Sequence, residues 1–172
     1  MISIERVWEG IREEGLNFGL PTLYLELGEG REYASAEELI RETLTLTRCR
    51  WVCILGEKTT QVGMGTLVKG LSAVGLNVEL ECPGSVRDPG WLHTADRWVV
   101  DYVKDGAFNY TALRSQDMVR FLVKNEGDLA YAREGFEALR LFSGTKCVKV
   151  LEEIHGVFDL VKRYDRSRVY RC

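Results

Sequence analysis

The sequence predicts an α/β fold, with a parallel-stranded sheet and helices outside it, either open or curved into a partial (β/α) barrel. Short apolar runs typical of buried strands alternate along the chain with segments whose apolar residues recur at helical spacing. The chain has 172 residues, of which 45% are hydrophobic and 28% charged, a composition typical of a globular protein rather than a disordered one. We therefore expect residues 1–172 to form a single α/β domain.

The first half of the chain combines apolar strands with clear helix signals. Ser35-Ala-Glu-Glu38 is a capping box, in which the serine hydroxyl accepts the N–H three residues on and Glu38 reaches back. Gly75 follows an apolar stripe of helical spacing and is the residue type that ends a helix in the left-handed conformation. The predicted strands span 2–7, 22–27, 51–55 and 76–81, and the predicted helices span 35–44 and 64–74.

The second half repeats the same alternation. The predicted strands span 98–101, 119–123, 147–151 and 168–171, and the predicted helices span 129–139 and 154–164. Because the carboxyl ends of parallel strands share one rim, and folds of this class bind ligands beyond that rim, residues that follow the strands are the first candidates for a site.

Charge and cysteine content exclude several classes of protein. There are 26 acidic and 23 basic residues, so the net charge is −3 and a nucleic-acid partner is not indicated. No apolar run reaches the ~20 residues that a membrane span needs, and the first residues do not resemble a signal peptide. Five cysteines, an odd number without a secretory signal, indicate reduced thiols and hence a cytoplasmic protein.

Three acidic residues lie at the ends of neighbouring predicted strands. Glu57 follows the strand at 51–55, Glu81 ends the next strand, and Asp101 ends the one after. A carboxylate at such a rim can bind a hydroxyl or an ammonium group, act as a base or hold Mg²⁺. The alternative interpretation is that each carboxylate only accepts hydrogen bonds where its strand closes.

The cysteine, histidine and glycine motifs give weaker evidence for a functional site than these carboxylates do. Cys49 and Cys53 would lie roughly 13 Å apart on one strand at ~3.3 Å per residue, too far for one zinc ion, so we predict no metal site. His93 follows a loop, where a structural role is the more common one for a lone histidine. The spacing of Gly63-Met-Gly65 and Gly28-Glu-Gly30 fits neither a P-loop nor a dinucleotide-binding fingerprint.

One stretch near the start of the chain resembles a known family. Residues 6–27 read Arg-Val-Trp-Glu-Gly-Ile-Arg-Glu-Glu-Gly-Leu-Asn-Phe-Gly-Leu-Pro-Thr-Leu-Tyr-Leu-Glu-Leu and resemble the opening of the 7-carboxy-7-deazaguanine synthases, small radical SAM enzymes of the queuosine and archaeosine route. Further matches follow in the family's order at residues 55–58, 78–85, 99–101, 109, 113, 117–123 and 128–132. The resemblance covers roughly residues 2–135 and implies a partial barrel of the radical SAM type.

The resemblance also implies where a ligand would bind. Glu14 matches the glutamate of the family's Gly-Glu-Gly, and Gly56 and Glu57 match its Gly-Gly-Glu-Pro. Glu81 and Asp101 match a strand-end glutamate and the aspartate of the following strand. These five residues are the predicted ligand-binding candidates, and no catalytic residue is assigned.

Three departures from the family pattern bear on the chemistry. The family holds its iron–sulfur cluster with a Cys-x3-Cys-x2-Cys loop, whereas residues 28–34 of this chain contain no cysteine. Leu55 replaces a glycine that lets the backbone approach S-adenosylmethionine, so no cofactor is expected, and residual binding of this molecule stays an open alternative. Glu26 replaces an arginine of the substrate site, which reverses the charge there.

These departures lead to a functional hypothesis. The chain is expected to be a relative that has lost the cluster and the radical SAM activity and acts as a non-catalytic interaction or regulatory partner. The alternatives are an enzyme with non-radical chemistry and a nucleoside or small-molecule binding module that uses the strand-end carboxylates.

We also expect association with another chain, as a homodimer or with a different protein. A group of aromatic residues is predicted near the strand-end face, where exposure would indicate an interface: Tyr24, Tyr33, Tyr102, Phe108 and Tyr110. The second and last strands are expected to leave edges that could pair with another chain. The alternative is that these rings fill the mouth of the barrel.

Overall fold

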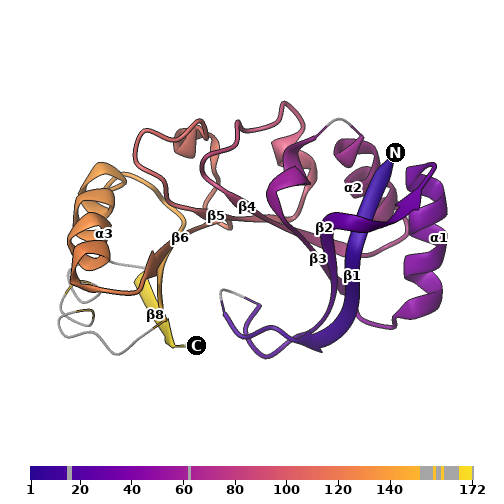
Figure 1. The fold of residues 1–172 in the computed structure, drawn as a ribbon, viewed down its shortest axis with the longest axis horizontal. Helices are drawn as coiled ribbons and strands as arrows, with labels where there is room; N and C mark the ends of the chain where they lie inside the picture. Colours follow the sequence, from indigo (N-terminus) through magenta and orange to yellow (C-terminus); the bar gives the residue numbers. More distant parts are fainter. Residues whose placement is uncertain (15–16, 62, 152–156, 158–159, 161–166, 172) are drawn as a thin grey trace.

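The computed structural model describes residues 1–14, 17–61, 63–151, 157, 160 and 167–171. Its sheet has eight strands, which neighbour one another in the order of the chain from β1 to β8. Figure 1 shows that the sheet curves into a crescent, with helices α1, α2 and α3 on the convex side. The predicted α/β partial barrel is thus confirmed.

The elements lie close to their predicted positions. The strands are β1 (Ile2–Ile11), β2 (Pro21–Tyr33), β3 (Trp51–Leu55), β4 (Asn77–Pro83), β5 (Arg97–Asp101), β6 (Met118–Val123), β7 (Thr145–Val150) and β8 (Ser167–Arg171). The α-helices are α1 (Ala36–Leu46), α2 (Met64–Ala73) and α3 (Glu126–Ala138), and short 3₁₀ turns are η1 (Glu57–Thr60), η2 (Leu92–Thr94) and η3 (Tyr110–Ala112). The predicted helix at 154–164 lies largely outside the described residues.

The predicted signals for the start of α1 and for the end of α2 both act as expected. The Ser35 hydroxyl accepts the Glu38 N–H at 3.3 Å, and the Glu38 carboxylate accepts the Ala34 N–H at 3.0 Å. Gly75 follows α2 with a φ of 87°, a conformation that glycine adopts without steric cost. Both predicted helix signals are confirmed.

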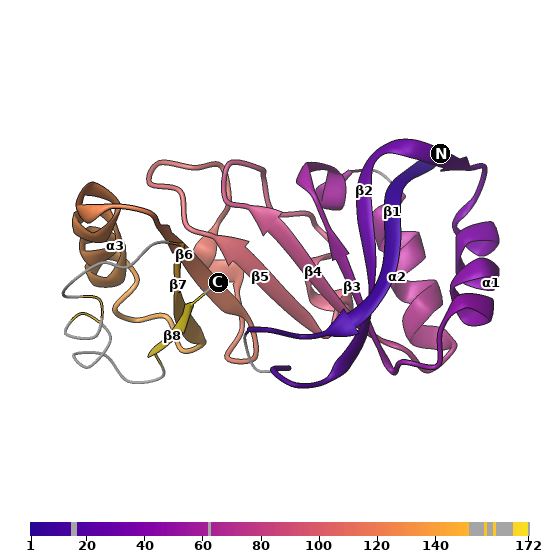
Figure 2. The same ribbon diagram turned by 60° about the horizontal axis from the view of Figure 1, so that its bottom comes forward.

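The first two strands correct the sequence prediction. β1 runs antiparallel to β2, while the remaining neighbours are parallel, because β1 and β2 are joined by a short connection without a crossover helix. β2 is also longer than predicted: residues 28–33 continue the strand, and Ile2 pairs with Tyr33. Figure 2 shows β1 lying beside β2 along its length, where the two strands pair. The prediction of an open edge at the second strand is therefore wrong.

The two faces of the sheet have different chemistry. Val52 and Ile54 belong to the main apolar core, together with Leu67 and Leu71 of α2. Cys53, between them in β3, instead donates to the Glu81 carboxylate at 3.5 Å. Because side chains alternate between the faces of a strand, the convex face packs on helices and the concave face carries polar groups.

The aromatic group predicted at the strand-end face is not exposed. Tyr24, Tyr33 and Phe108 are buried, and Tyr102 and Tyr110 are half-buried. Tyr102 and Tyr110 pack ring against ring at a centroid distance of 5.5 Å. These rings therefore pack within the molecule, and the expectation that they form an exposed surface is wrong.

Among the helices that the structure describes, none is long and apolar enough to cross a membrane.

Candidate functional site

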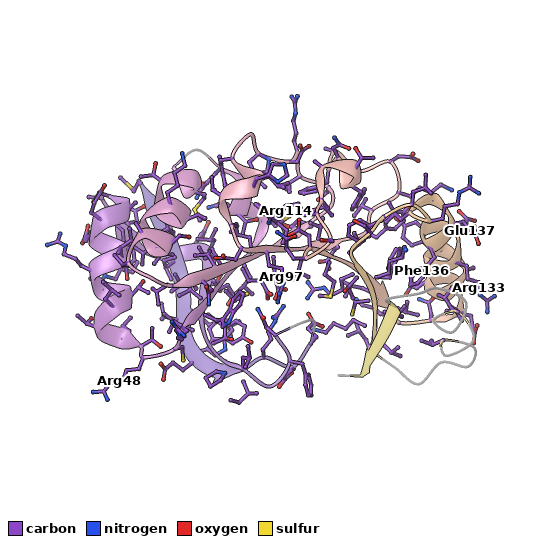
Figure 3. The ribbon with its side chains drawn as sticks, turned by 180° about the vertical axis from the view of Figure 1, so that it is seen from behind. Arg48, Arg97, Arg114, Arg133, Phe136 and Glu137 are labelled. Atoms are coloured by element: carbon purple, nitrogen blue, oxygen red, sulfur yellow. The ribbon has the colours of Figure 1, made fainter. Side chains whose placement is uncertain are left out.

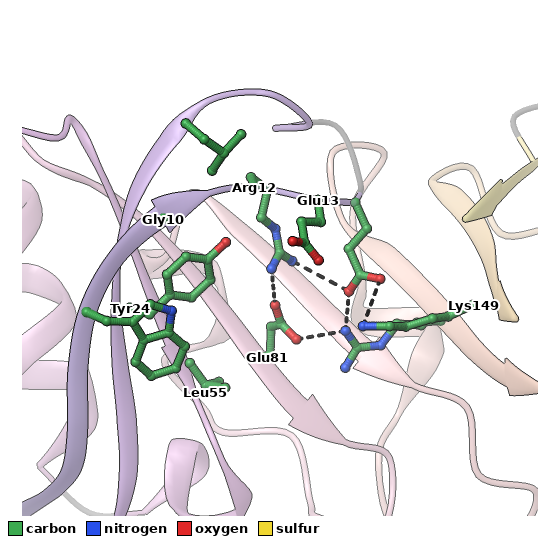
Figure 4. A pocket seen from close by; sticks show the side chains of 11 residues that line it. Gly10, Arg12, Glu13, Tyr24, Leu55, Glu81 and Lys149 are labelled. Carbon is green, nitrogen blue, oxygen red and sulfur yellow. Dashed lines mark hydrogen bonds and ion pairs between the residues drawn. The ribbon is translucent and has the colours of Figure 1, made fainter. Parts of the chain in front are cut away.

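Charged side chains from four strands and one loop meet on the concave face of the sheet. We call them the charge cluster: Arg12, Glu14, Glu79, Glu81, Arg97, Asp101, Arg120 and Lys149. Arg12 and Glu14 follow β1, and the others lie on β4, β5, β6 and β7. Figure 4 shows the central part of the cluster, with Arg12 close to Glu81 and Lys149 entering from the other side of the pocket.

Arg12 binds two carboxylates of β4. Its Nη1 lies 2.5 Å from Glu81 Oε1, and its Nη2 lies 2.8 Å from Glu79 Oε1. The amide of Asn17 donates to the other oxygen of Glu79 at 3.1 Å. All four side chains are buried, so the loop after β1 is tied to the middle of the sheet by charge-assisted contacts.

Arg120 joins three carboxylates. Its Nε lies 2.6 Å from Asp101 Oδ1, its Nη1 lies 2.8 Å from Glu81 Oε2, and the same Nη1 contacts Glu14. Glu81 is therefore shared by Arg12 and Arg120, one guanidinium on each carboxylate oxygen. Lys149 Nζ lies 3.4 Å from Glu14 and extends the pairing to β7.

Burial and pairing set the protonation of these groups. Burial raises the pKa of Glu81, but the Arg120 and Arg12 guanidiniums outweigh it and lower this pKa to about 2. Burial raises the pKa of Glu79 and of Asp101 more than their arginine neighbours lower it. Burial also raises the pKa of the Cys53 thiol well above its usual range, so this thiol is not a ready nucleophile.

The five predicted ligand-binding residues come together around two adjoining hollows. One hollow of about 260 Å³, at the carboxyl ends of the strands, is lined by Gly56, Glu57, Glu81 and Asp101. The other, of about 320 Å³, is lined by Glu14 and Glu81. The structure thus places the candidates at one rim, but only Glu57 among the acidic ones is exposed.

Gly56 has a structural reason to be glycine. Its φ is 123°, and a Cβ there would lie 2.8 Å from the carbonyl oxygen of Leu27. The turn from β3 into η1 therefore needs glycine on conformational and steric grounds, independent of any ligand.

Sequence reasoning did not identify Arg12, Glu79, Arg97, Arg120 or Lys149 as members of a site. A signal was present, because Glu79 and Arg120 are charged residues set between apolar neighbours within a strand. Such residues face the side of the sheet opposite to the core. The sequence did not show that they would find one another across strands.

The remaining candidates lie elsewhere or pair differently. His93 is exposed in η2, away from the charge cluster residues that line the two hollows. Cys49 precedes β3 and its thiol contacts Glu9 at 3.5 Å, whereas the Cys53 thiol contacts Glu81. These cysteines therefore do not share a site.

One group of possible metal ligands occurs among the described residues. Ligand atoms of Cys53, Glu79 and Glu81 lie within 4.8 Å of one another. The Arg12 guanidinium already forms ion pairs with both of these carboxylates, so a metal ion would have to displace it. The donor set is better described as an anchor for Arg12.

Comparison with known proteins supports the fold. The sequence matches neither a family model nor a curated protein. The structure is similar to the crystal structure of QueE from Escherichia coli, with a TM-score of 0.72 and 14% sequence identity over 99% of this chain and 93% of that chain. The likeness shows the fold: the chain is an α/β partial barrel of the kind seen in that structure.

Proposed function

We propose that this protein is a radical-SAM-like protein that holds no iron–sulfur cluster and acts as a non-catalytic interaction or regulatory partner. The observation that carries the proposal is the state of residues 28–34. They contain no cysteine, and most of them belong to β2 rather than to a loop.

The packing of this segment supports the proposal. The Gly30 N–H donates to the Ser3 hydroxyl at 3.3 Å, and a Cβ on Gly30 would lie 2.2 Å from the carbonyl oxygen of Ile4. The segment is therefore pressed against β1, with backbone where a side chain would have to fit. An iron–sulfur cluster needs several thiolates arranged around it, which a paired strand without cysteine does not supply.

The charge cluster supports a non-catalytic role. It pairs four cationic with four anionic side chains on the concave face, where this fold would receive a ligand. Arginines held between two or three buried carboxylates are committed to the fold, because separating them would leave buried charges unpaired. Groups bound in this way are poorly suited to exchange protons with a substrate.

Anaerobic reconstitution with iron and sulfide tests the proposal. We expect iron well below one atom per chain and no absorbance band of a cluster, because the described residues group no three thiolates. Cys82→Ala and Cys147→Ala variants serve as controls for iron held incidentally by buried thiols. Iron and sulfide near about four per chain, as a cubane cluster requires, would refute the proposal.

A second candidate function is binding of a small polar molecule in the two hollows. Two buried polar atoms favour it: Nε of Arg12 and Oε2 of Glu14 have no hydrogen-bond partner among the described residues. Oε2 of Glu14 does form an ion pair with Lys149. A molecule with an acceptor beside a donor, such as a nucleoside, would satisfy both atoms. Calorimetric titration with nucleosides, repeated on Glu57→Gln and Glu81→Gln, measures such binding.

A further inference from the structure

A further hollow, distinct from the two at the charge cluster, lies at the opposite end of the strands from the predicted ligand rim. We call it the amino-end hollow; it encloses about 610 Å³ and is lined by Glu9, Leu20, Pro21, Arg48, Cys49, Arg50, Trp51 and Asn77. Trp51 and Asn77 pair at the amino ends of β3 and β4, and Pro21 begins β2. The hollow is therefore separate from the site described above.

Two apolar side chains contribute to the wall of this hollow. Leu20, in the connection between β1 and β2, is 41% exposed. Trp51 contributes a half-buried indole to the lining. Exposed apolar residues that gather around a hollow are typical of a surface that binds another molecule.

The arginines at this end form no ion pair in the part of the chain that the structure describes. Arg48 and Arg50 are exposed and form no ion pair with any residue that the structure describes. Figure 3 shows the Arg48 side chain extending away from the ribbon below α1. The acidic residue of the lining, Glu9, accepts hydrogen bonds from the Thr47 hydroxyl and the Cys49 thiol. The two guanidiniums are thus available to an acidic group from outside.

We propose that the amino-end hollow binds an acidic segment of a partner protein. A large apolar side chain of that segment enters between Leu20 and Trp51, and carboxylates beside it pair with Arg48 and Arg50. The volume is within the ~300–1,000 Å³ of pockets that bury a ligand, which leaves room for an aromatic side chain. Apolar anchors ringed by arginine are also typical of the residues that dominate binding energy.

Charge favours an acidic protein segment over a nucleic acid. Two unpaired arginines on a chain of net charge −3 are few for a phosphate backbone, which usually binds to a basic surface. The proposal deepens the proposed function by assigning the surface of the interaction partner, and it rests on that function for the existence of a partner.

Selection from a random-peptide display library on the immobilised wild-type protein tests the proposal. We expect enriched peptides with an aromatic or leucine residue flanked by aspartate or glutamate. A synthetic peptide of the consensus should bind Arg48→Glu/Arg50→Glu at least ~10-fold more weakly, which is about 1.4 kcal/mol, and Leu20→Ser more weakly as well. Arg133→Glu on α3, an exposed arginine far along the chain, is the matched control and should bind as wild type.

Several outcomes would overturn the proposal. These are the absence of enriched peptides, enrichment of basic peptides, or equal binding by the double variant. If a labelled oligothymidylate bound more tightly than the consensus peptide, and the double variant lost this binding, the surface would be assigned to nucleic acid instead. Self-association in light scattering that the double variant abolishes would assign it to a second copy. Iron content is measured separately, so failure here is distinguishable from failure of the proposed loss of the cluster.

Discussion

Arginines in two regions of this molecule differ in their burial and in their ion pairing. Arg12 and Arg120 lie buried on the concave face and bind two or three carboxylates each. Arg48 and Arg50 flank the amino-end hollow, where they are exposed and form no ion pair with a described residue. The same side chain is therefore part of the fold in one region and available for recognition in the other.

The physical reason is the cost of burying charge. An ion removed from water loses several kcal/mol of solvation, so it is tolerated only with partners in good geometry. An exposed ion keeps its water, and its pairs are worth ~0–1 kcal/mol. We therefore expect substitutions in the charge cluster to change stability, and substitutions at the amino-end hollow to change binding alone.

The largest effect is expected from Arg120→Met. The substitution keeps most of the side-chain volume but leaves Glu14, Glu81 and Asp101 without their shared guanidinium. Loss of one partner from a buried ionic group costs about 3–5 kcal/mol, so urea-induced unfolding should show a free energy of unfolding lower by that amount. Arg133→Met, at an exposed position, is the control and should stay within ~0.5 kcal/mol of wild type. A loss below ~1 kcal/mol for Arg120→Met would mean that the cluster behaves as a surface network.

An intermediate effect on the free energy of unfolding is expected when the pH is lowered. The pKa of Glu81 is about 2 in the folded protein, below its ordinary 4.5, so the folded state binds this proton less readily than the unfolded state does. Its contribution to stability is therefore complete above the ordinary value and is lost as the pH falls from 4.5 towards 2. Glu79 and Asp101, whose pKa values are raised, act in the opposite direction and offset part of the loss.

Denaturant unfolding at a series of pH values, on wild type and Glu81→Gln, measures this contribution. The variant should be less stable at neutral pH, and the difference from wild type should shrink on acidification. Glu57→Gln, at an exposed carboxylate of the same rim, is the control and should unfold within ~0.5 kcal/mol of wild type at neutral pH. A difference between wild type and Glu81→Gln that does not depend on pH would contradict the assignment.

The smallest effect is expected from Arg48→Glu/Arg50→Glu. Because neither arginine pairs with a described residue, the double variant should unfold within ~0.5 kcal/mol of wild type by the same assay. A larger loss would show that these arginines contribute to the fold, and the contrast between the two regions would then disappear.

The elements of the fold were predictable where local chemistry decides. The capping box at Ser35, the glycine at 75 and the apolar run of residues 51–55 each determine a structure within a few residues, and each was placed correctly. The extension of β2 through residues 28–33 was missed because those residues are polar and rich in glycine. They are strand because β1 pairs with them, which is a contact between distant segments.

The candidate site was predictable in part. The rule that parallel strands end at one rim placed Glu57, Glu81 and Asp101 beside one hollow. It did not indicate that Arg120 would bind two of these three carboxylates, or that Arg12 would return from the loop after β1 to bind Glu81. Pairing across strands depends on register and curvature, which do not follow from the spacing of residues along the chain.

The sequence by itself determined the α/β alternation, the helix ends and the absence of cysteine from residues 28–34, because these follow from residue identity and local spacing. Only the tertiary structure decided which charges are buried. Arg12 follows β1 and Arg50 precedes β3, and both are arginines beside a strand end, yet curvature of the sheet encloses Arg12 among carboxylates and leaves Arg50 in water. Because the cost of an unpaired charge depends on its exposure to solvent, that enclosure assigns Arg12 to the fold and leaves Arg50 for recognition.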